Sequence, residues 1–230
     1  MERPRSDFFT KEHAELYDEK NAGLIPISSN LHFLMKLVLE KVQDRARVLS
    51  VGAGTGADIL SLARVFPEWS FVAVEPSLSM LSVCKERVHA AGFSNRCEFV
   101  HGFAEDLPMT EEFDVVTSLL VAHFVKRTER LGFFESLTKR LKKGGYLINA
   151  EIGFDLGSAQ FPSMLKNWES VQSLMGATPE SLASLPRTLA EILAVLPNGE
   201  TEEILRKAGI PLPVRFFQAF MISGWYGIKA

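Results

Sequence analysis

The stretch that most constrains the fold of this chain is an apolar strand that runs into a glycine-rich turn and then into a helix. It reads Arg-Val-Leu-Ser-Val-Gly-Ala-Gly-Thr-Gly-Ala-Asp-Ile-Leu over residues 47–60. Glycine has no Cβ and tolerates positive φ, so the backbone can bend sharply and approach a bound molecule closely. The following helix offers its free N–H groups to that same molecule. We therefore predict that this turn holds a nucleotide-like ligand.

Two classes of cofactor use such a turn, and the glycine spacing alone does not separate them. Gly52, Gly54 and Ala57 satisfy the dinucleotide pattern G-x-G-x-x-G/A, whereas the same first two glycines with Gly56 give G-x-G-x-G. The next apolar run ends in Glu75, at the spacing of a βαβ unit with a ribose-binding acid. We predict that this carboxylate binds a ribose diol; the alternative is a solvated glutamate after a strand.

Three further motifs follow in order along the chain. They are Gly102-Phe-Ala-Glu-Asp-Leu-Pro108, the strand opening Phe113-Asp114 and the strand opening Leu141-Lys-Lys-Gly-Gly145. Together with the glycine turn and the acid, this order resembles the class I S-adenosyl-L-methionine (SAM)-dependent methyltransferases, closely over residues 44 to 153. The segment from 214 to 229 looks like the final antiparallel hairpin of that family.

The resemblance implies an α/β, Rossmann-like fold with a seven-stranded, mostly parallel sheet, helices on both faces and an antiparallel C-terminal hairpin. It also implies SAM as cofactor and S-adenosyl-L-homocysteine as product. The positions implied to bind SAM are Gly52, Ala53, Gly54 and Gly56 at the methionine part, Glu75 at the ribose, Pro76, Met80, Phe103, Ala104 and Glu105 around the adenine, Leu119 beneath the cofactor, and Tyr17 from the N-terminal segment.

Two positions depart from the family pattern. Ser50 stands where the family usually has an acid, and Phe103 stands where it often has an aspartate. A serine can still hydrogen-bond a nearby polar group, but a contact without formal charge is weaker. Because Phe103 cannot bind the adenine amino group, that task would pass to Glu105 or Asp106 or to backbone groups, and we favour the Ala104 N–H and Glu105.

His123 is the candidate catalytic residue, because it follows the fourth strand where the family commonly has histidine. A pKa near neutrality would suit proton removal from an acceptor. Its neighbours in Val121-Ala-His-Phe-Val125 are apolar, however, so a buried structural histidine is the alternative. Trp168 raises a similar question, with packing as the default interpretation and substrate contact as the other.

Hydrophobic periodicity predicts alternating strands and helices in a single domain. We expect an N-terminal helical lid over 1–43 with a helix at 8–18, a SAM-binding core over 44–152, a helical cap over 153–198, and a final helix and hairpin over 199–230. The predicted strands cover 47–51, 70–74, 97–101, 113–118 and 145–151, and the predicted helices cover 30–42, 56–66, 77–91, 128–142 and 200–208.

Composition agrees with one such domain. The chain has 230 residues, of which 47% are hydrophobic and 23% charged, enough for one substantial core. A net charge of −3 argues against a nucleic-acid surface, and the basic cluster at 139–143 is attributed to a helix C-terminus. We found no apolar span of membrane length and no signal peptide, so we expect a cytoplasmic protein. Cys84 and Cys97 lack metal-ligand spacing and are expected to be reduced, buried thiols, and no metal is expected.

The expected reaction is transfer of the SAM methyl group to an acceptor, with a small molecule favoured by the size of the cap. Three alternatives stay open: a carboxy-SAM synthase on the same scaffold, a nicotinamide-linked oxidoreductase, and a non-catalytic SAM-binding interaction protein. The acceptor, and whether the protein is a monomer or a homodimer, do not follow from the sequence.

Overall fold

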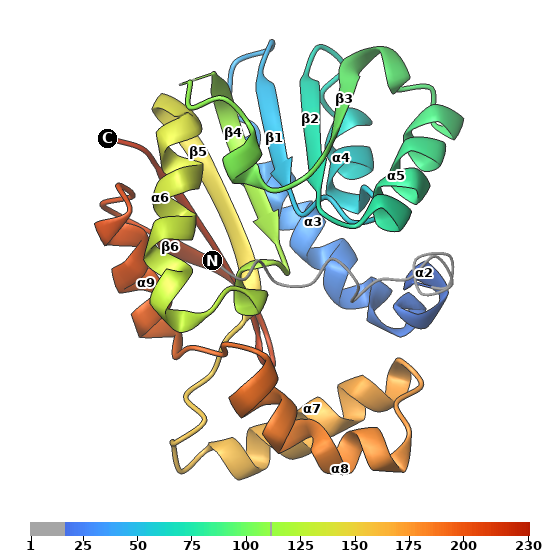
Figure 1. Cartoon of the computed structure of the whole chain (residues 1–230), viewed down its shortest axis with the longest axis vertical. Coiled ribbons are helices and arrows are strands. Elements are labelled where there is room, and N and C mark those ends of the chain that lie inside the picture. Colours follow the sequence, from blue (N-terminus) through green and yellow to red (C-terminus); the bar gives the residue numbers. More distant parts are fainter. Residues whose placement is uncertain (1–16, 111) are drawn as a thin grey trace.

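One seven-stranded sheet organises the protein, whose computed structural model describes residues 17–110 and 112–230. The strand order is β3-β2-β1-β4-β5-β7-β6 (Figure 1). The strands are β1 (Arg47–Val51), β2 (Ser70–Glu75), β3 (Cys97–His101), β4 (Phe113–Leu119), β5 (Leu141–Ile152), β6 (Val214–Ala219) and β7 (Ile222–Ile228). The pairs among β1 to β5 are all parallel, whereas β7 lies antiparallel to both of its neighbours, β5 and β6. The predicted Rossmann-like fold with its final hairpin is therefore confirmed.

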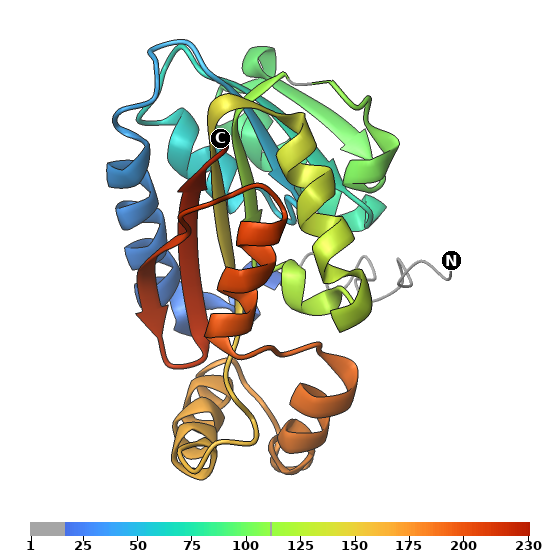
Figure 2. The ribbon, with the colours of Figure 1, turned by 90° about the vertical axis from the view of Figure 1, so that its left-hand side faces the viewer.

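Helices cover both faces of the sheet, as predicted. Figure 2 shows α3 on one side and α6 and α9 on the other. The helices are α2 (Tyr17–Lys20), α3 (Ile25–Leu39), α4 (Ala57–Ala63), α5 (Leu78–Ala90), α6 (Arg130–Arg140), α7 (Phe161–Leu174), α8 (Pro179–Arg187) and α9 (Asn198–Lys207). Short 3₁₀ turns occur at η2 (Ala22–Leu24), η3 (Ser94–Arg96), η4 (Ala104–Asp106), η5 (Ala122–Phe124) and η6 (Arg127–Glu129), and a π-helix forms η7 (Thr188–Ile192).

Alternate residues of the central strands enter two separate apolar layers. In β1, Val48 packs in the layer that contains Met35 and Leu39 of α3, whereas Leu49 packs in the layer that contains Phe134 of α6. Because both faces of the strand are buried, its sequence is apolar without the alternation of a half-exposed strand. This burial fixes the strands, so the turns at their carboxyl ends have a rigid base.

Two predicted boundaries were wrong. Helix α3 begins at Ile25 rather than at residue 30, because Pro26 lies in the first turn, where its missing N–H costs nothing. Strand β5 begins at Leu141 rather than at 145, and its pairing with β4 shifts register between Phe113 and Val115. The whole Leu141-Lys-Lys-Gly-Gly145 motif therefore lies within the strand that it was expected to open.

The basic cluster at 139–143 lies in part where it was predicted, because Lys139 and Arg140 are in the last turn of α6, and two of its cations also have specific partners. Arg140 is fully buried and donates hydrogen bonds to the carbonyl oxygens of Ser136 and Leu107, both at 2.8 Å. Lys142 belongs to β5 and forms an ion pair with Asp114, 2.9 Å from Nζ to Oδ1. These two cations therefore bind specific oxygens, in addition to any effect on the helix dipole.

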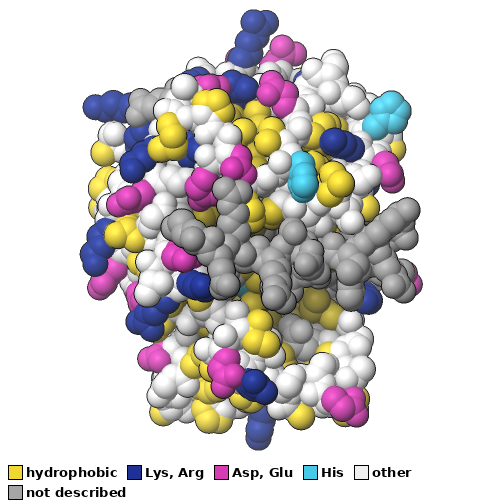
Figure 3. All heavy atoms as spheres, viewed as in Figure 1, with side chains coloured by type: hydrophobic (Ala, Val, Ile, Leu, Met, Phe, Trp, Pro, Cys, Tyr) yellow, Lys and Arg dark blue, Asp and Glu magenta, His cyan; other side chains and the backbone are white. Residues whose placement is uncertain are grey.

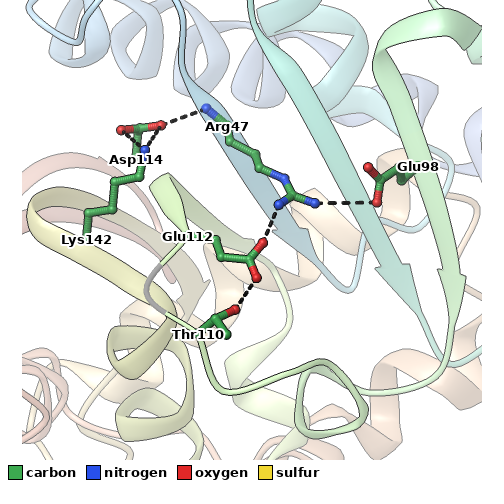
Figure 4. Close-up of polar contacts among 6 residues, drawn as sticks. All are labelled: Arg47, Glu98, Thr110, Glu112, Asp114 and Lys142. Carbon is green, nitrogen blue, oxygen red and sulfur yellow. Dashed lines mark hydrogen bonds and ion pairs between the residues drawn. The ribbon is translucent and has the colours of Figure 1, made fainter.

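A charged network joins the amino-terminal ends of the strands (Figure 4). The Asp114 carboxylate accepts hydrogen bonds from the Arg47 backbone N–H at 2.8 Å and from Lys142. The Arg47 guanidinium in turn contacts Glu112 and Glu98. Because these residues come from or next to β1, β3, β4 and β5, their contacts hold the four strands together at this edge. Asp114 thereby explains the Phe-Asp motif at the start of β4.

The segment between β5 and α9 forms a helical cap made of α7, α8 and η7, which lies beyond the carboxyl ends of the parallel strands (Figure 1). Trp168 of α7 is only 2% exposed and packs in an apolar cluster with Leu185 of α8 and Met221 of the final hairpin. The packing interpretation of this tryptophan is thus confirmed. The chain enters and leaves the cap side by side, since Gly153 and Leu196 form an isolated parallel bridge.

One stretch corrects the expectation that no span has the length and composition of a membrane helix. Ala22–Leu39 contains an 18-residue window with mean hydropathy 1.4, and 17% of that window is buried. Its buried residues Leu31, Met35 and Leu39 recur at helical spacing and pack in the apolar layers of the domain. The apolar character of this stretch therefore has a packing explanation within the fold.

Both cysteine expectations hold. Cys84 and Cys97 are free and buried. Burial in the apolar layer raises the pKa of each thiol to about 12, so both are protonated and unreactive at neutral pH.

We expect Asp114→Asn to destabilise the fold by about 1.5 to 3 kcal/mol, because the change removes the charge that Lys142 and the Arg47 N–H share. Urea denaturation at neutral pH measures this loss. Glu68→Gln is the matched control, since its exposed pair with Arg45 spans 3.8 Å and its loss changes stability by less than about 0.5 kcal/mol. Equal stability of the two variants would contradict the role of Asp114.

Candidate cofactor site

The glycine turn is tied to the carboxyl end of β2. The Gly52 and Ala53 N–H groups both donate to the Val74 carbonyl, at 2.8 and 3.1 Å. The Gly54 N–H donates to Glu75 Oε2 at 2.9 Å. Three successive amides of the turn are therefore fixed by two residues of β2, which places the turn beside the predicted ribose-binding acid.

Glu75 is held with part of its hydrogen-bonding capacity still available. Its Oε1 accepts a second hydrogen bond from the Ser77 N–H at 2.9 Å. A carboxylate has about four acceptor positions, so two remain for the hydroxyls of a diol. The side chain is only 6% exposed; burial raises its pKa, and the hydrogen bonds from Ser77 and Gly54 oppose that rise. Its ribose role stays a prediction that this geometry suits.

Two glycines of the turn lack a side chain for different reasons. A Cβ on Gly56 would lie 2.6 Å from Cys84 Sγ, so this residue is needed for packing against α5. A Cβ on Gly54 would meet nothing nearer than Met80 Cε at 3.6 Å. Both residues have positive φ, of 80° and 55°. Packing within the protein therefore does not require a glycine at position 54, which leaves close approach of a ligand to the backbone as the reason that we expect for it.

The predicted adenine-binding residues surround this space from two loops. Pro76 and Met80 follow β2, and the Met80 N–H donates to the Ser77 hydroxyl that caps α5. Phe103 and Ala104 follow β3, the next strand of the sheet, where Phe103 is half-buried and Ala104 is buried. The structure thus brings the two predicted loops to the carboxyl ends of neighbouring strands.

The two acids proposed to replace the family aspartate differ in their surroundings. Asp106 Oδ2 accepts a hydrogen bond from the Phe103 N–H at 2.8 Å and so closes its own turn. Glu105 is exposed and faces no such constraint from this turn. The arrangement favours Glu105 and the Ala104 N–H for the adenine amino group, as predicted, and their role stays a prediction.

Two further predicted residues lie at the edges of the site. Leu119 ends β4 and is half-buried between the sheet and the cap. Tyr17 begins α2 and is also half-buried, and its carbonyl accepts hydrogen bonds from the Asn21 backbone and side chain. The rest of the predicted helix at 8–18, through residue 16, lies outside the described residues.

Sequence reasoning missed Asp58, in the first turn of α4. Its carboxylate accepts hydrogen bonds from Ser50 Oγ at 2.8 Å, from Thr117 Oγ1 at 2.7 Å and from the Ile59 N–H at 2.8 Å. Ser50 therefore does bond a polar group, as expected, but its partner is charged. The available signal was an acid within the otherwise apolar helix that follows the glycine turn.

His123 is a buried residue of η5, in the loop after β4. It is 3% exposed, and its Nδ1 accepts a hydrogen bond from the Ile152 N–H at 3.3 Å. Burial, with a smaller contribution from Arg130, lowers its pKa to about 3. The geometry thus favours the structural interpretation, and the rate of methyl transfer by a His123→Ala variant tests the catalytic one.

A buried ion pair supports the same loop. Arg130 and Glu151 are both fully buried and 2.6 Å apart, and the Thr201 hydroxyl donates to the other Glu151 oxygen at 2.6 Å. Arg130 also donates to the carbonyls of Val125 and Ala194. This network joins the loop after β4, the sheet, α9 and the return segment of the cap.

A cavity of about 270 Å³ lies between that loop and the cap. Its walls combine apolar side chains, with Phe124 on the loop side and Leu189, Ile192 and Leu193 on the cap side, with three charged residues. These are Lys126, Arg127 and Glu191. The loop that forms one wall also reaches the glycine turn, because Val121 packs directly on Gly52. Within residues 17–110 and 112–230, no three His, Cys, Asp or Glu side chains gather as in a metal site.

Comparison with known proteins gives the family. A family model described as a methyltransferase domain matches residues 48–145. Probable phthiotriol/phenolphthiotriol dimycocerosates methyltransferase 2 of Mycobacterium ulcerans is 35% identical over 107 residues, 46% of this chain and 39% of that relative. Ubiquinone/menaquinone biosynthesis C-methyltransferase UbiE of Pseudomonas savastanoi is 30% identical over 184 residues, 76% of this chain and 70% of the relative. Carboxy-S-adenosyl-L-methionine synthase of Methylococcus capsulatus is 21% identical over 227 residues, 96% and 93% of the two chains.

A solved structure agrees in fold. An O-methyltransferase family protein from Burkholderia thailandensis superimposes with a TM-score of 0.65 at 14% identity, and the match covers 91% of this chain and 58% of that chain. This chain thus spans less than two thirds of that structure and of the mycobacterial relative. It belongs to the class I SAM-dependent methyltransferases, a family that uses S-adenosyl-L-methionine as cofactor. The predicted resemblance is confirmed, and the nicotinamide alternative is set aside.

The two glycines of different function give a prediction. Gly54→Ala should abolish SAM binding at a cost in stability of about 1 to 2 kcal/mol, because alanine is strained at positive φ and its methyl group fills the ligand space. Gly56→Ala should cost more stability, because the same strain is joined by overlap with Cys84. Calorimetric titration and urea denaturation of both variants separate the two effects. Normal SAM affinity in Gly54→Ala would refute the assignment.

The pKa of His123 predicts a pH dependence of stability. The imidazole has an ordinary pKa of 6.5 and a folded value of about 3, so the unfolded chain binds more protons between these values. With respect to this histidine, the free energy of unfolding is therefore highest above about pH 6.5 and decreases as the pH falls from 6.5 towards 3. Between pH 7 and pH 5 the wild type should lose about 2 kcal/mol more than His123→Asn, whose amide oxygen can accept from Ile152. Parallel pH profiles in urea denaturation would contradict this prediction.

Proposed function

We propose that this protein transfers the sulfonium methyl group of SAM to a small-molecule acceptor. The carrying observation is the glycine turn, whose Gly54 amide is bonded to the Glu75 carboxylate and whose Gly54 position is not required to be glycine by packing within the protein. This arrangement presents a backbone surface and a diol-binding acid together at the carboxyl edge of the sheet, where α/β folds bind nucleotides.

The acceptor is proposed to bind between this edge and the cap. Methyl transfer from a sulfonium asks mainly for alignment of donor and acceptor and for exclusion of water. The cap supplies apolar walls, and the cavity next to Phe124 adjoins the loop that contacts the glycine turn. An acceptor with an apolar body and a polar or charged group fits a cavity that Lys126, Arg127 and Glu191 also line. On the face shown in Figure 3, the coloured Lys, Arg, Asp and Glu side chains are intermixed.

The first experiment is calorimetric titration with SAM, S-adenosyl-L-homocysteine and NADH. The wild type should bind the first two, and Glu75→Gln should weaken both by about 2 to 5 kcal/mol, because the ribose loses charge-assisted contacts. Glu68→Gln, an exposed glutamate elsewhere on the chain, is the matched control and should bind normally. A screen of acceptors with labelled SAM then identifies the substrate.

Other outcomes would point to other functions. Binding of NADH alone would overturn the proposal. Binding of SAM without turnover on a broad set of acceptors would favour a non-catalytic SAM-binding protein that acts through a partner.

A second candidate is synthesis of carboxy-SAM. It is favoured by one observation: the match to the Methylococcus capsulatus synthase spans 96% of this chain, including the cap and the hairpin, although at 21% identity. Mass spectrometry of the ligand that copurifies with the protein separates the two. Carboxy-SAM exceeds SAM by the mass of carbon dioxide, whereas a methyltransferase yields SAM or S-adenosyl-L-homocysteine.

A further inference from the structure

Asp58 is a buried carboxylate without a cationic partner. It is 7% exposed, and its three hydrogen-bond donors, two hydroxyls and one amide, are all neutral. Within residues 17–110 and 112–230, no Lys, Arg or His forms an ion pair with it, in contrast to the paired Glu151. A buried charge is costly unless a counter-charge compensates it. A cationic ligand would therefore compensate the charge of Asp58.

The position of Asp58 indicates which ligand this is. Its two hydroxyl donors come from Ser50 of β1 and Thr117 of β4, which are paired in the sheet. The strand order reverses between these two strands, and open α/β sheets bind their ligands at this crevice, beyond the carboxyl ends. Asp58 lies in the first turn of α4, which begins after Gly56, and its carboxylate contacts Ser50, two residues before the first glycine of the turn.

The carboxylate has one acceptor position left for a ligand. Oδ2 accepts both hydroxyls, whereas Oδ1 accepts only the Ile59 N–H. With two positions on each oxygen, Oδ1 can accept one more hydrogen bond. Burial lowers the pKa of His32 in α3, and the nearby Asp58 carboxylate opposes that shift. No ion pair joins His32 to Asp58 in the described part of the chain.

We propose that Asp58 binds the α-ammonium group of the methionine part of SAM, and so replaces the acid that the family usually carries at the Ser50 position. The acid has moved from the end of β1 to the first turn of α4, and the hydroxyl of Ser50 holds it in place. This inference rests on the proposed function, since it requires SAM in the glycine turn.

The test compares two ligands that differ in the ammonium group. S-adenosyl-L-homocysteine carries the amino-acid part, whereas 5′-methylthioadenosine keeps the nucleoside and lacks that part. For Asp58→Asn, we expect the Kd of S-adenosyl-L-homocysteine to rise about 10- to 100-fold and that of 5′-methylthioadenosine to change less than about 2-fold. The exchange variant Ser50→Asp/Asp58→Ser should restore S-adenosyl-L-homocysteine binding to within a few-fold of the wild type, because it keeps a carboxylate and a hydroxyl at the same place.

Several outcomes would overturn the inference. Equal losses for both ligands would show that Asp58 only shapes the turn, and unchanged binding of S-adenosyl-L-homocysteine would exclude the contact. If Asp58→Asn does not fold, the exchange variant decides alone: binding of both ligands supports the proposal, and binding of 5′-methylthioadenosine only refutes it. A wild type that binds neither ligand would instead overturn the proposed function, which distinguishes the two failures.

Discussion

The arrangement of the carboxyl edge of the sheet depends on the hydrogen bonds between the glycine turn and the end of β2. The Val74 carbonyl accepts two amides of the turn, and the next residue, Glu75, accepts a third through its side chain. These contacts fix where α4 begins, and therefore where Asp58 lies relative to β1 and β4. If these hydrogen bonds were lost, Glu75, Gly54 and Asp58 would no longer be held in one fixed arrangement.

The two edges of the sheet differ in how they use charge. At the amino edge, Asp114 and Arg47 find oppositely charged partners within the protein (Figure 4). At the carboxyl edge, the carboxylates of Glu75 and Asp58 are held by hydroxyl and amide groups, and no ion pair to them occurs in the described part of the chain. The ion pairs at the amino edge stabilise the fold, whereas the two carboxylates at the carboxyl edge remain available to a ligand.

The sequence predicted the parallel strands and the glycine turn well, because both depend on local signals: apolar runs and residues that permit positive φ. It predicted the start of β5 less well, because the pairing with β4 shifts register there and Gly144 and Gly145 bond instead to the backbone of Lys229, far along the chain. Asp58 was missed for a related reason. Its role depends on Thr117, 59 residues away along the chain, and no local pattern reports such a contact.

The bridge between Gly153 and Leu196 has a consequence for how this protein can change over evolutionary time. Because the chain leaves and rejoins the sheet at adjacent points, the intervening helices form one continuous insertion, which also packs on the final hairpin through Trp168 and Met221. Changes within this insertion that keep its packing surface would leave the strands and the glycine turn undisturbed. Such a chain can acquire a new acceptor while it inherits its methyl-donor machinery unaltered.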